Sequence, residues 1–278
     1  MGIFDKLTGG PTRRDLGPAP ARARARVPMI AGNWKMNCSL VEAVNLSQAV
    51  SYKFYHPYDR VEIVLCPAFP HLRSVWNVLE FDKSDIKLGA QDCHWEDKGA
   101  YTGCVSAEMV RDTGCDYCII GHSERRGYFG ETDEDVNRKA HALVAKGVWP
   151  IMCCGESLEC RDEGRTLEFV CAQVRAGLAG LQPEQAAKCV VAYEPIWAIG
   201  TGRTATPQQA QEVCAAIRAT LAELFGQQAA DKMRILYGGS MKPENVGLFL
   251  PMEDIDGGLI GGAALDADSF AELVRAAE

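Results

Sequence analysis

The stretch AYEPIWAIGTGRTATP, residues 192–207, decides how the rest of the chain is interpreted. It contains the carboxylate of Glu194 at the end of an apolar run, followed by a small-residue tip at Ala198–Gly202. Thr206 and Pro207 are typical of a helix N-cap and first helical position. A strand that ends in a carboxylate, then a glycine-containing loop and a helix start, predicts a base beside a lid that excludes water. An ordinary strand–helix connection is the alternative, and the remaining sequence decides between them.

Apolar runs alternate with amphipathic stretches from Met29 onward. The runs are Met29–Ala31, Val61–Cys66, Ile86–Ala90, Tyr117–Ile120, Val148–Cys153, Cys189–Tyr193, Arg234–Tyr237 and Ile255–Ile260. The helix-like stretches include Leu40–Phe54, Asp133–Lys146, Leu167–Leu178, Pro207–Phe225 and Ser269–Ala276. Short apolar runs interleaved with helices over about 250 residues predict an α/β fold, a closed parallel (β/α)8 barrel in one domain. Right-handed crossovers would then place every strand C-terminus at one rim.

Polar side chains follow two of these runs. Asn33 and Lys35 follow the first run, within GNWKMN, and His122 follows the fourth, within GHSERR. A lone lysine is most often a surface residue and a lone histidine is most often structural. His122, however, comes directly before an expected helix start, where partial positive charge disfavours the imidazolium form. A neutral ring could donate a hydrogen bond to a substrate oxygen, and we expect Glu124 to organise Lys35 without reacting itself.

Paired glycines follow the last two runs. Gly238 and Gly239 precede Ser240, and Gly261–Gly262 follows the eighth run. Glycines let backbone amides approach an oxyanion closely, and the loops after the seventh and eighth strands of such barrels often bind phosphate. Together with Gly200 in the expected lid, these pairs predict a phosphate site.

These motifs resemble those of the triosephosphate isomerase family, over about residues 29–265 and in the same order. The resemblance implies a TIM barrel that interconverts dihydroxyacetone phosphate and D-glyceraldehyde 3-phosphate through an enediolate, in glycolysis and gluconeogenesis, with no cofactor and no metal. It makes Glu194 the catalytic base, His122 the donor to the substrate oxygens, and Lys35 with Asn33 the groups that stabilise negative charge. The residues that match the family's phosphate ligands are Gly200, Ser240, Gly261 and Gly262.

The long segment Gln91–Ser106 is rich in turn-forming residues, and loops of this length are usually functional or interaction surfaces. In the family that the chain resembles, this loop inserts into a second subunit, and Thr102 matches the contacting threonine. We therefore expect a homodimer, or a tetramer built from dimers. Cys104 stands where many relatives carry an acidic residue, which puts individual ion pairs of the interface in doubt.

Other chemistries fit the sequence less well. A Schiff-base aldolase needs a buried lysine inside a strand, and the interiors of the apolar runs contain none. A catalytically silent scaffold would have lost Lys35, His122 or Glu194, and all three are present. Cys153 matches a buried cysteine with a packing role in the family, which favours packing over nucleophilic catalysis.

Composition narrows the class of protein and its location. The formal net charge of −8 argues against nonspecific nucleic-acid binding, which needs a basic surface. No apolar run approaches the roughly 18 residues of a membrane span. Cysteines dispersed through a chain this long indicate buried thiols in a reducing compartment, so we expect a cytoplasmic protein. Residues 1–28, rich in Arg, Pro and Ala, cannot bury an apolar face and are expected to be a disordered extension of the barrel domain at 29–278, with organelle targeting as the alternative.

Overall fold

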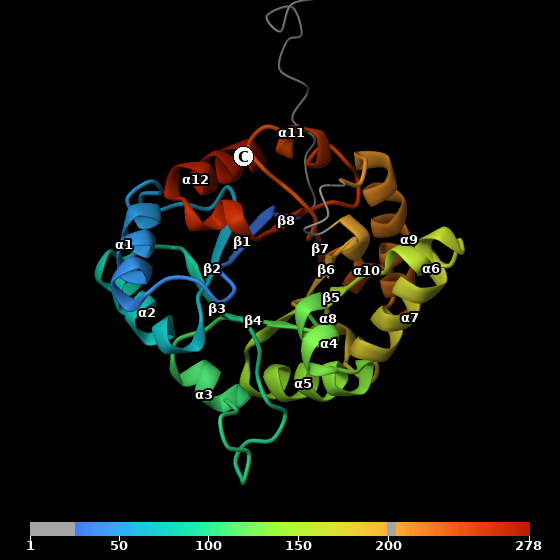
Figure 1. The fold of residues 1–278 in the computed structure, drawn as a ribbon, viewed down its shortest axis with the longest axis horizontal. Coiled ribbons are helices and arrows are strands. Elements are labelled where there is room, and N and C mark those ends of the chain that lie inside the picture. The colour runs from blue at the N-terminus through green and yellow to red at the C-terminus, as the bar shows by residue number, and fades with distance from the viewer. Residues whose placement is uncertain (1–25, 199–203) are drawn as a thin grey trace, which may run out of the picture.

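A closed barrel of parallel strands forms the centre of the molecule, and helices surround it (Figure 1). The computed structural model describes residues 26–198 and 204–278. The strands in this part of the chain are β1 (Met29–Asn33), β2 (Glu62–Cys66), β3 (Lys87–Ala90), β4 (Tyr117–Ile120), β5 (Trp149–Cys154), β6 (Val190–Tyr193), β7 (Arg234–Tyr237) and β8 (Gly257–Ile260). Each pairs with the next, and β1 pairs with β8, with Met29 opposite Gly257. The predicted (β/α)8 barrel is confirmed.

The helices follow the strands along the chain. They are α1 (Leu40–Ser51), α2 (Leu72–Phe81), α3 (Ala107–Asp112), α4 (Ser123–Phe129), α5 (Asp133–Lys146), α6 (Leu158–Asp162), α7 (Thr166–Leu178), α8 (Pro183–Ala186), α9 (Pro207–Phe225), α10 (Gln227–Ala230), α11 (Val246–Phe249) and α12 (Ala267–Ala277). The 3-10 turns are η1 (Phe69–His71), η2 (Ile196–Ala198) and η3 (Gly262–Leu265). α5 and α9 have the predicted bounds, because Thr132 and Thr206 each accept a hydrogen bond from the third helical residue and fix where the helix begins.

Apolar residues are buried on both faces of the barrel wall. Side chains that alternate along the strands fill the interior, among them Ala31, Ile119 and Ala192. The residues between them, such as Ile30 and Ile120, pack outward against the helices. This double burial explains why the strands are continuous apolar runs without polar alternation.

The last residues of the expected N-terminal extension contact the barrel. Residues 1–25 lie outside the described part of the chain, so the expected disorder stays a prediction for them. The Arg26 Nε donates to Asp256 Oδ1 over 2.7 Å, and the carbonyl of Pro28 accepts from the N–H of Glu62. These contacts lie at the N-terminal ends of the strands, away from the predicted active site.

Two further expectations concern the cysteines and the membrane. Most of the cysteines are buried thiols, including Cys153, and Cys104 is exposed. Within the described residues, no helix is long and apolar enough to cross a membrane.

Candidate active site

A cavity of about 410 Å³ opens at the C-terminal ends of the strands. The predicted site residues that line it are Asn33, Lys35, His122, Glu194, Ser240, Gly261 and Gly262. Asn33 is the last residue of β1 and the others follow β1, β4, β6, β7 and β8, so the barrel brings together residues that lie far apart in the sequence. Gly200 and the rest of the expected lid tip, residues 199–203, lie outside the described residues.

Glu194 directly follows β6 and is the most deeply buried carboxylate of the cavity wall, with 2% of its surface exposed. Its Oε2 accepts from the Ser123 N–H over 2.9 Å, and its Oε1 accepts from the Ser123 hydroxyl over 3.2 Å. The Nε2 of His122 lies 3.0 Å from the same Oε1. Both carboxylate oxygens of Glu194 therefore have partners already in place, Ser123 on both oxygens and His122 on Oε1.

His122 caps the start of α4, and this position fixes its ring. Its Nδ1 accepts a hydrogen bond from the Glu124 N–H over 3.2 Å, so Nδ1 carries no proton in that contact. The remaining proton of a neutral ring must then be on Nε2, which points at Glu194 and into the cavity. This hydrogen-bond pattern produces the tautomer that can donate to a ligand oxygen.

The contact between His122 and Glu194 shifts the pKa of each group. Burial lowers the pKa of His122, but the neighbouring Glu194 carboxylate raises it, and the pKa lies above its ordinary value. Burial raises the pKa of Glu194, whereas His122 and the donors of Ser123 lower it, and the net pKa lies below its ordinary value. The carboxylate 3.0 Å away therefore opposes the lowering of the His122 pKa that the helix start alone predicts, while the hydrogen bond that Nδ1 accepts from the Glu124 N–H is one that only the neutral ring can accept.

Lys35 extends into the cavity from a strained turn after β1. Its backbone has φ 51°, in the left-handed region that non-glycine residues seldom adopt. Asn33 Oδ1 accepts from the Lys35 N–H over 3.0 Å and supports this turn. The ammonium lies 2.6 Å from Glu124 Oε1, the pairing expected from the sequence. Strain of this kind persists only where the surroundings hold it, and it is frequent at functional sites.

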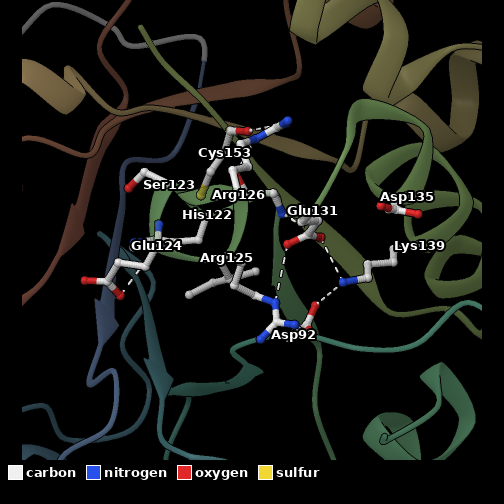
Figure 2. A network of polar contacts seen from close by, with 12 residues as sticks. Asp92, His122, Ser123, Glu124, Arg125, Arg126, Glu131, Asp135, Lys139 and Cys153 are labelled. Carbon is white, nitrogen blue, oxygen red and sulfur yellow. Dashed lines mark hydrogen bonds and ion pairs between the residues drawn. The ribbon is translucent and has the colours of Figure 1, made fainter. Parts of the chain in front are cut away.

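A network of charged side chains, largely buried, lies next to the segment that carries His122 (Figure 2). Gly121, which precedes His122, has φ +68°, where a side chain would be strained. Its N–H donates a hydrogen bond to Glu131 Oε1 over 3.3 Å, and the same oxygen lies 2.8 Å from Lys139 Nζ. Asp92 joins Lys139 and Arg125 at 2.6 and 2.9 Å. Two carboxylates and two cations thus balance their charges behind the strand end that leads to His122.

The glycine pairs shape the opposite wall of the cavity. A Cβ on Gly238 would lie 2.9 Å from Glu194 Cγ, so only glycine allows this close approach. Gly262 is the first residue of η3, a position whose N–H has no partner within its own helix. Gly261 and Ser240 lie beside it in the cavity lining. This wall offers backbone amides and a hydroxyl, the donors that suit an oxyanion.

Comparison with known proteins agrees with this geometry. The model of the triosephosphate isomerase family matches residues 28–277. The triosephosphate isomerase of Lactiplantibacillus plantarum is 51% identical over 251 residues, covering 90% of this chain and 98% of the relative. That of Streptococcus pyogenes serotype M2 is 51% identical over 250 residues, with the same coverage of both proteins. The chain belongs to the triosephosphate isomerase family. Its reaction is therefore the interconversion of dihydroxyacetone phosphate and D-glyceraldehyde 3-phosphate, a step of glycolysis.

Three residues of this triosephosphate isomerase site were missed by sequence reasoning. Ser123 holds Glu194 with two hydrogen bonds. Gln91 donates to the carbonyl of Lys35 over 2.8 Å and so ties the turn after β1 to the end of β3. Only Ser123 carried a signal, because a serine at the first helical position offers both an N–H and a hydroxyl.

Glu156 is the third missed residue, and it anchors the chain that leaves Glu194. It is fully buried, and its Oε1 accepts from the Tyr193 hydroxyl over 3.1 Å and the Trp197 indole over 2.8 Å. Arg161 lies 3.1 Å from the same oxygen. The residues on both sides of Glu194 are thereby fixed to one buried charge, which limits how β6 and η2 can shift.

Proposed function

We propose that Glu194, His122 and Lys35 carry out the isomerisation in this cavity. The observation that supports the proposal most strongly is the 3.0 Å contact between Glu194 and His122 inside a cavity that Lys35 also lines. A proton shift between adjacent carbons needs a base, a donor to two neighbouring oxygens and a positive charge for the enediolate. These three side chains supply one group each.

The reaction begins when Glu194 removes a proton from the carbon beside the substrate carbonyl. The electrons of the broken C–H bond form the C=C bond of an enediolate, and the carbonyl electrons move to oxygen. His122 donates from Nε2 to that oxygen, while Lys35 and Asn33 stabilise the negative charge. Glu194 then returns a proton to the neighbouring carbon, while His122 gives its Nε2 proton to the former carbonyl oxygen and takes the proton of the adjacent hydroxyl, which becomes the new carbonyl without net oxidation. To act, the carboxylate exchanges its bonds to Ser123 and His122 for the substrate, and as it leaves His122 the attraction that raises the pKa of that ring becomes weaker.

The phosphate group of the substrate is assigned to the glycine-rich wall. Ser240, Gly261 and Gly262 line the cavity at the ends of β7 and β8, the region that binds phosphate in many such barrels. Gly200, outside the described residues, is proposed as a further ligand from the sequence match alone.

Replacement of the base tests this assignment. Glu194→Gln keeps the shape of the side chain but cannot take a proton, so kcat for dihydroxyacetone phosphate should fall roughly 10²- to 10⁴-fold. Glu159→Gln removes an exposed carboxylate outside the cavity and serves as the matched control, with unchanged kcat. Near-normal turnover of the Glu194→Gln protein would show that another group is the base.

We also infer that the chain forms a homodimer through the loop at residues 91–106. The loop projects from the barrel between β3 and α3 (Figure 1), and Thr102 within it is exposed. Exposed apolar side chains lie in this loop and in the turn and helix after β1: Met36, Leu40, Val41 and Tyr101. Exposed apolar groups of this kind mark protein interfaces. Sedimentation at micromolar concentration should give twice the chain mass, and a fully active monomer would refute the proposal.

A cytoplasmic location is proposed from the thiols. Cys104 is exposed and Cys38 and Cys160 are partly exposed, and such cysteines stay reduced in the cytosol. A fluorescent fusion of the full chain should be distributed through the cytoplasm, whereas accumulation in an organelle would assign a targeting role to residues 1–28.

A further inference from the structure

The charges at the bottom of the cavity are largely balanced by their neighbours. Lys35 is paired with Glu124 at 2.6 Å, and Glu194 is paired with His122 at 3.0 Å. The chain as a whole carries a formal net charge of −8. A phosphate dianion approaching this protein therefore meets a repulsive overall field, and the paired groups do little to attract it from a distance.

Among the described residues that line the cavity, Lys242 is the second lysine, and it lies at the rim in the loop after β7. Its side chain is exposed and forms no ion pair with any residue in the described part of the chain. Its backbone is held firmly: Asn245 Oδ1 accepts from the Lys242 N–H over 2.8 Å, and the Lys242 carbonyl accepts from Asn245 and Val246 over 3.0 and 2.9 Å. Asn245 also donates to the Ser240 carbonyl, so the loop keeps this lysine beside the phosphate wall.

Glu244 stands two residues further along the same loop. It also lines the cavity, is exposed and forms no ion pair with the described residues. Among the described residues, the rim thus carries one unpaired charge of each sign, and these two charges should act on a dianion in opposite directions.

We propose that Lys242 is a steering residue, which raises the rate of capture of the dianionic substrate, and that Glu244 opposes it. The proposal rests on the proposed function and extends it to the encounter step. An exposed ammonium acts through the solvent, so its effect belongs to kcat/KM and is sensitive to salt, whereas kcat depends on the buried groups below. The rim loop therefore sets how efficiently the site collects its substrate at low concentration.

The experiment compares three charge-removing variants in kcat and kcat/KM as ionic strength is raised. Lys242→Gln should lower kcat/KM about fivefold at low ionic strength, as expected for a unit charge acting on a dianion from about 8 Å in water. Glu244→Gln should raise kcat/KM by a similar factor. Both differences should vanish near 1 M salt, where charges are screened within about 3 Å, and kcat should stay unchanged.

Lys232→Gln is the matched control. Lys232 is also exposed and precedes β7, at the other end of the barrel, and the four residues of the strand alone rise about 13 Å. It changes the net charge by the same amount, so its kcat/KM should equal that of the wild type. An equal loss in Lys232→Gln, a salt-independent loss in Lys242→Gln, or a fall in kcat would overturn the proposal. An inactive wild-type protein would instead overturn the proposed function.

Discussion

The two ends of the barrel contain the same kinds of charged residue and use them differently. At the N-terminal end of the strands, Asp256 Oδ1 accepts from Arg26, and its Oδ2 accepts from Arg218 and from the N–H of Ile235, all within 2.7 to 2.9 Å. At the C-terminal end, Glu194 is bonded to Ser123 and His122 and borders an open cavity. Both carboxylates are buried and both have several partners.

The difference lies in whether a partner can be exchanged. The partners of Asp256 are fixed by further contacts, since Arg218 also donates to the carbonyl of Ala230, and neither Asp256 nor Arg218 belongs to the lining of the active-site cavity. Glu194 and its partner His122 both line a cavity in which a substrate can replace a partner of the carboxylate. Buried charge therefore stabilises one end of the barrel and is available for proton transfer at the other.

Removal of Asp256 should give the largest effect on stability. Asp256→Ala removes one of the two carboxylates that pair with the buried Arg218, whose other partner is Asp254, and leaves the Ile235 N–H without its acceptor, which together should cost about 3–5 kcal/mol of unfolding free energy. Urea unfolding measures this loss, and kcat of the folded fraction should not change, because the residue is distant from the cavity. Glu223→Ala breaks the exposed pair with Arg175 and should cost no more than about 1 kcal/mol. A comparable loss in both variants would show that burial is not what separates the two pairs.

Within the N-terminal extension, we expect only Arg26 to contribute to the unfolding free energy, and by less than Asp256. Arg26→Ala removes a charged hydrogen bond to Asp256 and should cost about 1–3 kcal/mol. Deletion of residues 1–25 leaves that bond in place and should leave the unfolding free energy unchanged. If the deletion destabilised the protein as much as Arg26→Ala, the extension would contribute contacts of its own.

The smallest expected effect is a shift in the titration of His122, at the active-site end of the barrel. Because Glu194 raises the pKa of His122, the ring should titrate by NMR above its ordinary pKa of 6.5 in the wild type. In Glu194→Gln, burial remains but the opposite charge is lost, so the titration should move to lower pH. The stability that the pair contributes should be complete between about pH 4.5 and 6.5, lost above as His122 deprotonates and lost below as Glu194 is protonated. An unchanged titration in the variant would contradict the coupling.

The sequence predicted the barrel well because its strands are buried on both faces. β4 and β7 coincide with the predicted runs, and the residues that follow the runs do line one cavity. Local signals could not show which residues hold the catalytic groups. Ser123 and Glu194 lie 71 positions apart, and the contact of Gln91 with Lys35 spans 56. Such contacts depend on the closed barrel, as does the positive φ of Lys35.

The fate of the transferred hydrogen tests the central claim most directly. If Glu194 carries the proton through an enediolate, its carboxyl proton can exchange with solvent before it is returned to carbon. Isomerisation of dihydroxyacetone phosphate in D₂O should then give D-glyceraldehyde 3-phosphate that contains deuterium at carbon 2, measured by NMR at low conversion. Glu194→Gln should lose this product along with turnover. Product formed at the wild-type rate with no deuterium at carbon 2 would mean direct hydride transfer between the carbons, and the role assigned to Glu194 would be wrong.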